Sequence, residues 1–281
     1  MAQRSRKTPL AVGDSGRKVL PREPATPGDK TLTKGLQLLE ALSQCEGSRG
    51  ISELANELSL TKSNVHRLLQ TLSRCGYVTQ EASTERYLLS SKLWQVARRG
   101  RPYDALRRLI RPVLRDLVDE TGESVLFCVL ENDELVPIDQ VETHYPVRVF
   151  FSVGQSFPID RVVMMGKALT ALQLIALASR PPMEARLAIR KVQKQLQKSA
   201  NYVESELSKL SDVRNCGFAM SKGEWIDGAN AVAVPVSDAA HSLIGVLSCF
   251  GPAERLTEAR LRKIQKMLAR GAEDLARRLC A

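Results

Sequence analysis

One stretch of the chain decides the fold of its first domain: Thr61-Lys62-Ser63-Asn64-Val65-His66-Arg67-Leu68-Leu69-Gln70-Thr71-Leu72. Its apolar residues recur at helical spacing and predict one buried stripe, made of Val65, Leu68, Leu69 and Leu72. The opposite side carries hydrogen-bonding and basic groups and no acid. Because a helix with such side chains fits the DNA major groove, we expect this helix to contact bases and phosphates.

The residues before this stretch complete a helix-turn-helix. Thr33 opens an expected first helix, and Ser52 is the expected N-cap of a second helix over 53–58. Ser59 and Leu60 form the turn, and Thr61 caps the third helix. Two helices joined by a turn of about four residues are typical of this DNA-binding motif.

A hairpin follows the third helix. Residues 77–80 and 86–89 are strand-like, and the polar segment 81–85 between them predicts a turn. This hairpin is an expected wing with an acidic tip, so Arg86 at its base is its best phosphate candidate. The expected DNA-binding residues are therefore Ser52, Lys62, Ser63, Asn64, His66, Arg67, Thr71 and Arg86.

Two of these residues have alternative roles. Arg67 is favoured as a guanine or phosphate contact, and the alternative is a structural salt bridge with Glu40 or Glu57. For His66 the sequence leaves a DNA contact and a surface position equally open.

The net charge of +10 is unevenly distributed. Residues 1–30 carry +4, residues 98–115 carry +6 with seven arginines, and residues 116–281 carry −1. Basic segments on both sides of a helix-turn-helix suit phosphate contact. Instead of contacting phosphates, the basic residues of 1–30 can form a solvated tail. The arginines of 98–115 can form a solvated helix face or ion pairs with a dimer partner. Residues 1–29 have no periodicity and predict a disordered basic tail.

Other features exclude several protein classes. At 281 residues the chain can hold two domains, and it has no apolar run of about 18 residues, so no membrane span is expected. The cysteines form no CxxC pair and lie outside metal-ligand spacing of any histidine. We therefore expect the cysteines to act as small hydrophobic side chains in a reduced cytoplasm, and we expect the chain to hold neither a metal nor a cofactor. The chain has no GxSxG or P-loop motif, which argues against an enzyme.

The second half of the chain alternates between strand and helix patterns. Residues 91–102 predict a linker helix, and the order of the later elements predicts an α+β domain with an antiparallel sheet. Pro112 predicts a kink or a restart in its first helix. The expected strands are 124–130, 134–141, 147–153, 217–222, 229–236 and 243–250, and the expected helices are 104–121, 165–177, 180–198, 202–213 and 257–279.

The ordered motifs of both halves resemble the IclR family of bacterial transcription regulators. The first half carries Gly35-Leu36-x-Leu38-Leu39, Glu53-Leu54-Ala55, Leu60-x-Lys62-Ser63-x-Val65-His66-Arg67-Leu68-Leu69 and Gly76-Tyr77-Val78. The second half carries Glu120-x-Gly122-Glu123-Ser124-Val125, Gly166-Lys167-Ala168, Cys216-Gly217-Phe218-Ala219, Ala233-x-Pro235-Val236 and Gly251-Pro252. The resemblance covers about residues 31–280.

The resemblance implies a winged helix-turn-helix joined by a helix to a GAF-like effector-binding domain. Its expected partners are a double-stranded DNA operator, a small organic effector and a second copy of the chain, in dimers or dimers of dimers. The expected segments are a tail over 1–29, a DNA-binding domain over 30–90, a linker over 91–102 and an effector domain over 103–281.

The sequence departs from the family pattern at four places. Ser59 replaces the usual glycine, which predicts strain of about 1 kcal/mol if that position needs a positive φ. Asn64 replaces the usual threonine and can bond an adenine edge. The other two departures fall in the ligand pocket that the resemblance implies, where methionines and a phenylalanine replace small or polar residues.

The expected pocket residues are Met164, Met165, Gly166, Ser221, Ala231, Ser248 and Phe250. Methionine and phenylalanine favour a flat or apolar ligand, and the few polar groups can orient one polar end. We therefore expect a largely apolar, aromatic ligand in place of a small keto-acid. The alternative is that Met164, Met165 and Phe250 fill the cavity themselves.

Overall fold

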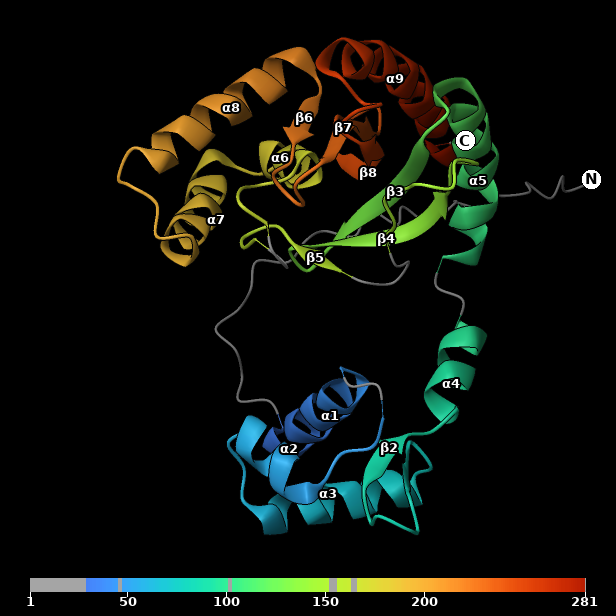
Figure 1. Ribbon diagram of the computed structural model, residues 1–281, viewed down its shortest axis with the longest axis vertical. Coiled ribbons are helices and arrows are strands. Elements are labelled where there is room, and N and C mark those ends of the chain that lie inside the picture. The colour runs from blue at the N-terminus through green and yellow to red at the C-terminus, as the bar shows by residue number, and fades with distance from the viewer. Residues whose placement is uncertain (1–28, 45–46, 101–102, 152–155, 163–165, 281) are drawn as a thin grey trace, which may run out of the picture. The chain divides into compact units, whose positions relative to one another are not determined.

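The computed structural model describes residues 29–44, 47–100, 103–151, 156–162 and 166–280. Internal contacts divide the chain into two units, one up to Arg101 and one from Pro102 (Figure 1). The expected disordered tail over 1–29, except Asp29, lies outside the described residues, as do Met164 and Met165. Each unit is described by itself.

The first unit begins with three helices, α1 (Lys30–Ser43), α2 (Ile51–Glu57) and α3 (Lys62–Arg74). Helix α1 starts before the predicted Thr33 because the Asp29 side chain accepts hydrogen bonds from the backbone of Thr31 and Leu32, at 2.7 and 3.2 Å. Three residues of the predicted stripe of α3, Val65, Leu68 and Leu69, are buried against α1 and α2, and the fourth, Leu72, is half-buried.

Two N-caps in this unit test the sequence-based assignments. Thr61 caps α3 as predicted, because its hydroxyl accepts from the backbone of Asn64 at 3.3 Å. The prediction for Ser52 as an N-cap is wrong. Gly50 holds that position in α2, and the Glu53 carboxylate lies 3.4 Å from the Gly50 nitrogen. Ser52 is an exposed residue of the first turn of α2.

The turn between α2 and α3 contains a backbone conformation that glycine adopts more easily. Ser59 has φ +52°, and its side chain is exposed. The sequence predicts backbone strain at Ser59 if this position has a positive φ, and the structure shows that it does. The turn is closed by backbone hydrogen bonds from Ser59 to Asn56 and from Leu60 to Ala55.

The wing and the linker helix follow α3. Strands β1 (Val78–Gln80) and β2 (Tyr87–Leu89) pair antiparallel, as the hairpin pattern predicted. Arg49 also pairs with Tyr87, which ties the loop before α2 to the wing. Helix α4 spans Lys92–Gly100, within the predicted linker.

The second unit is built on a six-stranded antiparallel sheet with the order β5-β4-β3-β8-β7-β6 (Figure 1). Between β3 and β4, Asn132 and Asp133 both have positive φ and form the predicted turn. The strands are β3 (Ser124–Glu131), β4 (Glu134–Val141), β5 (Phe157–Pro158), β6 (Ala219–Lys222), β7 (Ala229–Ser237) and β8 (Leu243–Pro252). The predicted α+β class with an antiparallel sheet is confirmed.

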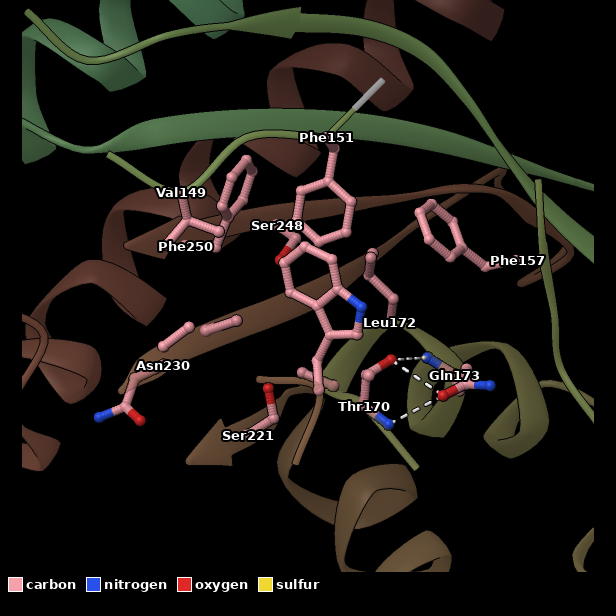
Figure 2. Close-up of a pocket in the computed structure, with 14 residues that line it drawn as sticks. Val149, Phe151, Phe157, Thr170, Leu172, Gln173, Ser221, Asn230, Ser248 and Phe250 are labelled. Carbon is pink, nitrogen blue, oxygen red and sulfur yellow. Dashed lines mark hydrogen bonds between the residues drawn. The ribbon is translucent and has the colours of Figure 1, made fainter. Parts of the chain in front are cut away.

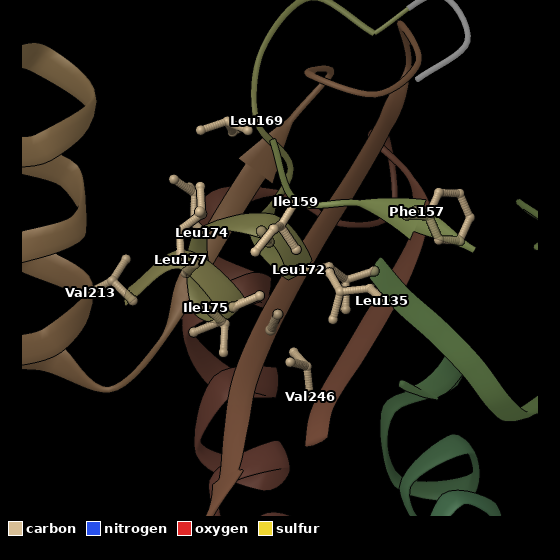
Figure 3. Packing of buried hydrophobic residues seen from close by; sticks show 14 of the residues in the cluster. Leu135, Phe157, Ile159, Leu169, Leu172, Leu174, Ile175, Leu177, Val213 and Val246 are labelled. Atoms are coloured by element: carbon tan, nitrogen blue, oxygen red, sulfur yellow. The ribbon is translucent and has the colours of Figure 1, made fainter. Parts of the chain in front are cut away.

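Helices cover both faces of this sheet. On one face lie α5 (Asp104–Thr121) and α9 (Glu258–Cys280), packed against alternate residues of β3 such as Phe127. On the other face lies α6 (Ala171–Ala178), followed by α7 (Pro182–Gln195) and α8 (Tyr202–Cys216). Figure 3 shows Leu172 and Ile175 of α6 near Leu135 and Val246 of the sheet. The central strand β3 is therefore buried on both faces.

Three predictions in this unit are corrected. The strand over 147–153 is absent from its described part, 147–151. The Val147 carbonyl instead accepts a hydrogen bond from Arg255, and β5 is the edge partner of β4. Helix α6 begins at Ala171 because Thr170 and Gln173 form a capping box. Of the two outcomes that Pro112 predicted, a kink or a restart, the restart is absent, because helix α5 continues through this residue.

Candidate DNA-binding surface and ligand pocket

The solvent-facing side of α3 carries most of the predicted DNA-binding residues. Lys62, Ser63, His66, Arg67 and Thr71 are exposed. The Thr71 hydroxyl donates to the Arg67 carbonyl at 3.0 Å within the helix. In the same unit, Asn64 is half-buried and Ser52 is exposed on α2. The helix therefore presents a polar, cationic face to solvent.

Arg67 is available for an external partner. Among the described residues, its side chain has no recorded hydrogen bond or ion pair, and Glu57 pairs with Arg49 at 2.5 Å instead. The structural alternative of a salt bridge from Arg67 to Glu40 or Glu57 is thus not realised.

Arg86 is engaged inside the first unit. Its guanidinium donates to both carboxylate oxygens of Glu53 at 2.9 Å and to the Ser48 carbonyl at 2.9 and 3.1 Å. Pairing with Arg86 lowers the pKa of the Glu53 carboxyl. These contacts join the wing to α2 and favour a structural role for Arg86.

The structure adds two residues to the predicted α3 surface. Gln70 and Arg74 are exposed. The steps from Ser63 to Arg67, from Arg67 to Gln70 and from Gln70 to Arg74 are four, three and four residues, so all four share one side of the helix. Gln70 belongs to the polar side that the sequence predicts for this helix, and the same spacing could have identified Arg74. Gln70 also lies 3.4 Å from His66, measured between their Nε2 atoms.

The arginine run is divided between two roles. Arg107 and Arg111 of α5 pair with Asp139, a carboxylate that is 1% exposed, at 3.3 and 2.7 Å. Arg108 and Arg115 are exposed. Arg101 and the side chains of Arg98 and Arg99 lie outside the described part of the chain.

A pocket lies in the second unit between α6, the strands β6, β7 and β8, and the segment that contains Phe151 (Figure 2). Four of the predicted ligand residues line it: Ser221, Ala231, Ser248 and Phe250. Gly166 is half-buried and is not one of its lining residues. The other lining residues, which were not predicted from the sequence, are Val149, Phe151, Phe157, Thr170, Ala171, Leu172, Gln173, Trp225, Ala229 and Asn230.

Aromatic rings dominate the pocket. The Phe151 ring stacks on Trp225 with centroids 4.2 Å apart and an interplanar angle of 14°. It meets Phe157 and Phe250 edge-to-face, at 5.4 and 4.7 Å. We call Phe157, Trp225 and Phe250 the aromatic cage. With the Phe151 ring inside the cage, the free volume of the pocket is about 40 Å³.

The polar groups of the pocket are few and uncharged. Of the fourteen lining residues that the structure describes, none is acidic, basic or a histidine. The Ser248 hydroxyl donates to the Val232 carbonyl at 3.1 Å. The indole nitrogen of Trp225 is buried without a partner among the described atoms. A bound molecule can therefore find hydroxyl groups and an N–H donor here.

Two ion pairs hold the segments beside the pocket. Lys167 pairs with Asp227 at 2.6 Å, and its backbone nitrogen donates to the Glu224 carbonyl next to Trp225. Arg255 makes two hydrogen bonds, of 2.5 and 2.8 Å, to the fully buried Glu123. Arg255 also donates to the Val147 carbonyl at 3.0 Å, four residues before Phe151.

Cysteine and metal chemistry find little support in the described ranges. Burial raises the pKa of the Cys128 thiol well above its usual range and that of Cys249 to about 12, so neither is a reactive thiolate near neutral pH. No group of three or more potential metal ligands occurs among the described residues. In the same part of the chain, no helix has the length and apolar character of a membrane span.

Two family models match the chain in the order of its two units. The IclR helix-turn-helix domain matches residues 31–82, and the C-terminal domain of the bacterial transcriptional regulator IclR matches residues 103–277. The chain belongs to the IclR family. It is therefore a DNA-binding transcription regulator with a C-terminal effector domain, from a family of regulators rather than enzymes.

Individual relatives agree with this IclR assignment. The chain is 29% identical over 248 residues to the HTH-type transcriptional regulator KdgR of Escherichia coli strain K12, which covers 88% of this chain and 91% of KdgR. An IclR transcriptional regulator of Alicyclobacillus acidocaldarius is similar in structure, with a TM-score of 0.70, 25% identity, and coverage of 88% of this chain and 98% of that chain. An IclR homologue of Microbacterium hydrocarbonoxydans, solved in complex with 4-hydroxybenzoate, has a TM-score of 0.66 and 19% identity, and covers 89% of this chain and 98% of that chain.

Proposed function

We propose that this IclR-family chain regulates transcription by binding an operator through α3, with an affinity that a small aromatic ligand in the second unit modulates. The observation that carries the DNA-binding half is the side of α3 formed by Ser63, Arg67, Gln70 and Arg74, which is exposed while the opposite stripe is buried. A helix of this kind can enter the major groove without losing its packing.

The roles of the α3 side chains follow from their chemistry. Arg67 can donate two hydrogen bonds to a guanine edge or contact a phosphate, and Asn64 or Gln70 can bond an adenine edge. Lys62 and Ser63 in the first turn suit phosphate contact. The contacts of Arg86 with Glu53 make its phosphate role secondary in this proposal.

The variant Arg67→Ala tests the DNA-binding role. The Arg67 side chain has no recorded partner in the described unit, so its removal should change thermal stability little and weaken operator binding by about 1–3 kcal/mol. Arg190→Ala, at an exposed arginine on α7, is the matched control and should leave both quantities unchanged. A loss of stability that equals the loss of binding would make Arg67 a structural residue.

The ligand half rests on the lining of the pocket. A small keto-acid needs several donors around its carboxylate, and the described lining offers no cation. Aromatic and apolar side chains favour a flat ring, with Ser221 and Ser248 available for one polar end. A homologue of the same fold that was solved with 4-hydroxybenzoate supports an aromatic ligand. In calorimetric titrations, aromatic carboxylates should bind more tightly than glyoxylate or pyruvate, and the reverse order would contradict this assignment.

A homodimer would connect the two sites. Operator binding by this motif needs two recognition helices at a half-site spacing set by the dimer. Large exposed apolar side chains in the first unit support an interface there: Leu32 and Leu36 on α1, Leu88 on β2, and Trp94 and Val96 on α4. A ligand that favours one spacing by about 1–3 kcal/mol changes operator occupancy roughly 5–150-fold.

The direct experiment is a mobility-shift titration with the DNA upstream of the gene, at roughly physiological salt and with competitor DNA. Saturable binding that survives the competitor supports a specific regulator. Aromatic acids can then be tested for release or tightening of the complex. If binding disappears with salt and competitor, the chain is better explained as a ligand sensor that acts through protein partners.

A further inference from the structure

The ring of Phe151 has the position and surroundings expected of a bound aromatic molecule. It is stacked on Trp225 and meets Phe157 and Phe250 edge-to-face, so one ring is enclosed by three others. The side chain is 9% exposed. Figure 2 shows the Phe151 ring among the labelled pocket residues, between Ser248 and Phe157.

An aromatic ligand cannot enter this pocket while Phe151 stays there. The free volume is about 40 Å³. An engineered apolar cavity that accepts benzene has a volume of about 150 Å³. One of the rings in the pocket must therefore move before a ligand can bind.

Phe151 is the ring that the fold holds least firmly. Phe250 lies on β8 near the centre of the sheet, and Phe157 lies on β5, which pairs with β4. Trp225 lies in the turn that Lys167 holds through the Glu224 carbonyl and Asp227. Phe151 instead follows a segment, 142–150, that has no regular secondary structure.

Two apolar residues before Phe151 expose their side chains to solvent, while Val149 between them is half-buried and lines the pocket. Phe150 is 56% exposed and Val147 is 70% exposed. The backbone of this segment is held at Val147 by Arg255, so the four residues after that point can change conformation while the Arg255 contact remains. No residue from 142 to 151 belongs to a strand, so expulsion of the Phe151 ring breaks no β-sheet hydrogen bond within this described segment.

We propose that an aromatic ligand binds this pocket by replacing the Phe151 ring in the aromatic cage, so that Phe151 is a built-in competitor of the ligand. This inference rests on the proposed ligand-binding function of the second unit. The unpartnered indole nitrogen of Trp225 adds to it, because a ligand with an acceptor at the edge of the indole would supply the missing hydrogen bond. The hydroxyls of Ser221 and Ser248 lie in the same lining.

The proposal predicts the effect of removing the competitor. If Phe151 leaves the cage empty in only a minor fraction of molecules, the apparent affinity of the ligand equals its intrinsic affinity multiplied by that fraction. Phe151→Ala should then bind 4-hydroxybenzoate and phenol more tightly than the wild-type chain, by about ten- to a hundredfold given the stability of a buried phenylalanine. Phe150→Ala is the matched control, because the same change is made at the exposed neighbour, and it should bind as the wild type does.

The titrations are made on the full chain by calorimetry, with Phe151→Leu as a second variant in case the alanine variant does not fold. Tighter binding by Phe151→Ala, or a smaller gain by Phe151→Leu, supports the proposal. Equal or weaker binding than wild type overturns it and makes Phe151 a wall of the site, while the proposed effector function stands. If no probe binds any variant, both fail, and the mobility shift still tests DNA binding separately.

A spectroscopic measurement follows the ring itself. The chain has six phenylalanines, so 3-fluorophenylalanine labelling gives a small set of fluorine resonances, and Phe151→Leu identifies that of residue 151. On saturation with 4-hydroxybenzoate, this resonance should move toward the solvent-exposed value of Phe150. A Phe151 resonance that stays at its buried position in the complex overturns the displacement.

Discussion

The substitution Ser59→Gly should stabilise the first unit. Ser59 has φ +52°, a conformation that costs a residue with a Cβ roughly 1–2 kcal/mol. Glycine removes that cost but adds about 0.4–1 kcal/mol of backbone freedom in the unfolded chain. The exposed Ser59 side chain has no recorded hydrogen bond, and the backbone bond to Asn56 is kept. The net gain should be about 0.5–1 kcal/mol.

Hydrogen exchange of the segment 51–74 measures this gain where it arises. Opening of α2 and α3 should become less frequent, and amide exchange should slow about two- to fivefold for 0.5–1 kcal/mol. The unfolding temperature of a unit of this size should rise by roughly 2–8 °C.

Ser52→Gly is the matched control, because it makes the same change at an exposed position inside α2. There glycine should destabilise by about 0.5 kcal/mol, since the helical backbone has no strain to relieve. If Ser59→Gly accelerates exchange as Ser52→Gly does, the turn is not strained and the reasoning is wrong.

Three further predictions concern other parts of the chain. Pairing with Arg86 lowers the pKa of Glu53 in the folded chain. The stabilisation from this pair should therefore be complete well above the ordinary pKa of 4.5 and should decline as the pH falls through the lowered pKa. The variant Glu53→Gln should remove this acid dependence of the unfolding free energy, measured by urea titration. Arg255→Met leaves the fully buried Glu123 unpaired and should cost about 3–5 kcal/mol, part of which Glu123→Gln in the same chain should recover. Neutralising Arg98, Arg99 and Arg101 should weaken binding to all DNA sequences alike and flatten the salt dependence, whereas a loss confined to the operator would contradict phosphate contact.

Local patterns predicted caps, buried stripes and turns well in both units. The cap at Thr61, the buried stripe of α3 and the Asn132-Asp133 turn each depend on residues within a few positions of one another. The wrong starts of α1, α2 and α6 have a common explanation, because side-chain contacts at the N-terminus set the true start of each helix. At Ser52 the cap was placed by residue type, and the helix over 165–177 was begun too early; in the structure, the Gly50 and Thr170 backbone N–H groups donate to the Glu53 and Gln173 side chains and mark the true starts of α2 and α6.

The pocket was predicted only in part because its residues come from distant segments. Ser221, Ala231, Ser248 and Phe250 lie on strands whose pattern was recognised. Phe151 was placed in an expected strand over 147–153 that the structure does not have, and Trp225 lies in a turn, so no correct periodicity indicated which way either side chain points. The stacking of two rings 74 positions apart in the chain depends on the folded sheet and could not be inferred from local sequence.

The cluster around Arg255 also bears on how the second unit folds. Its guanidinium joins Glu123, 132 positions earlier in the chain, and Val147, 108 positions earlier. Contacts between such distant positions form only after large loops have closed, so we expect this cluster to form late in folding. The cluster should therefore be absent from the folding transition state, and breaking it should accelerate unfolding while leaving the folding rate nearly unchanged. Arg255 would then set how long the folded effector domain persists rather than how quickly it forms.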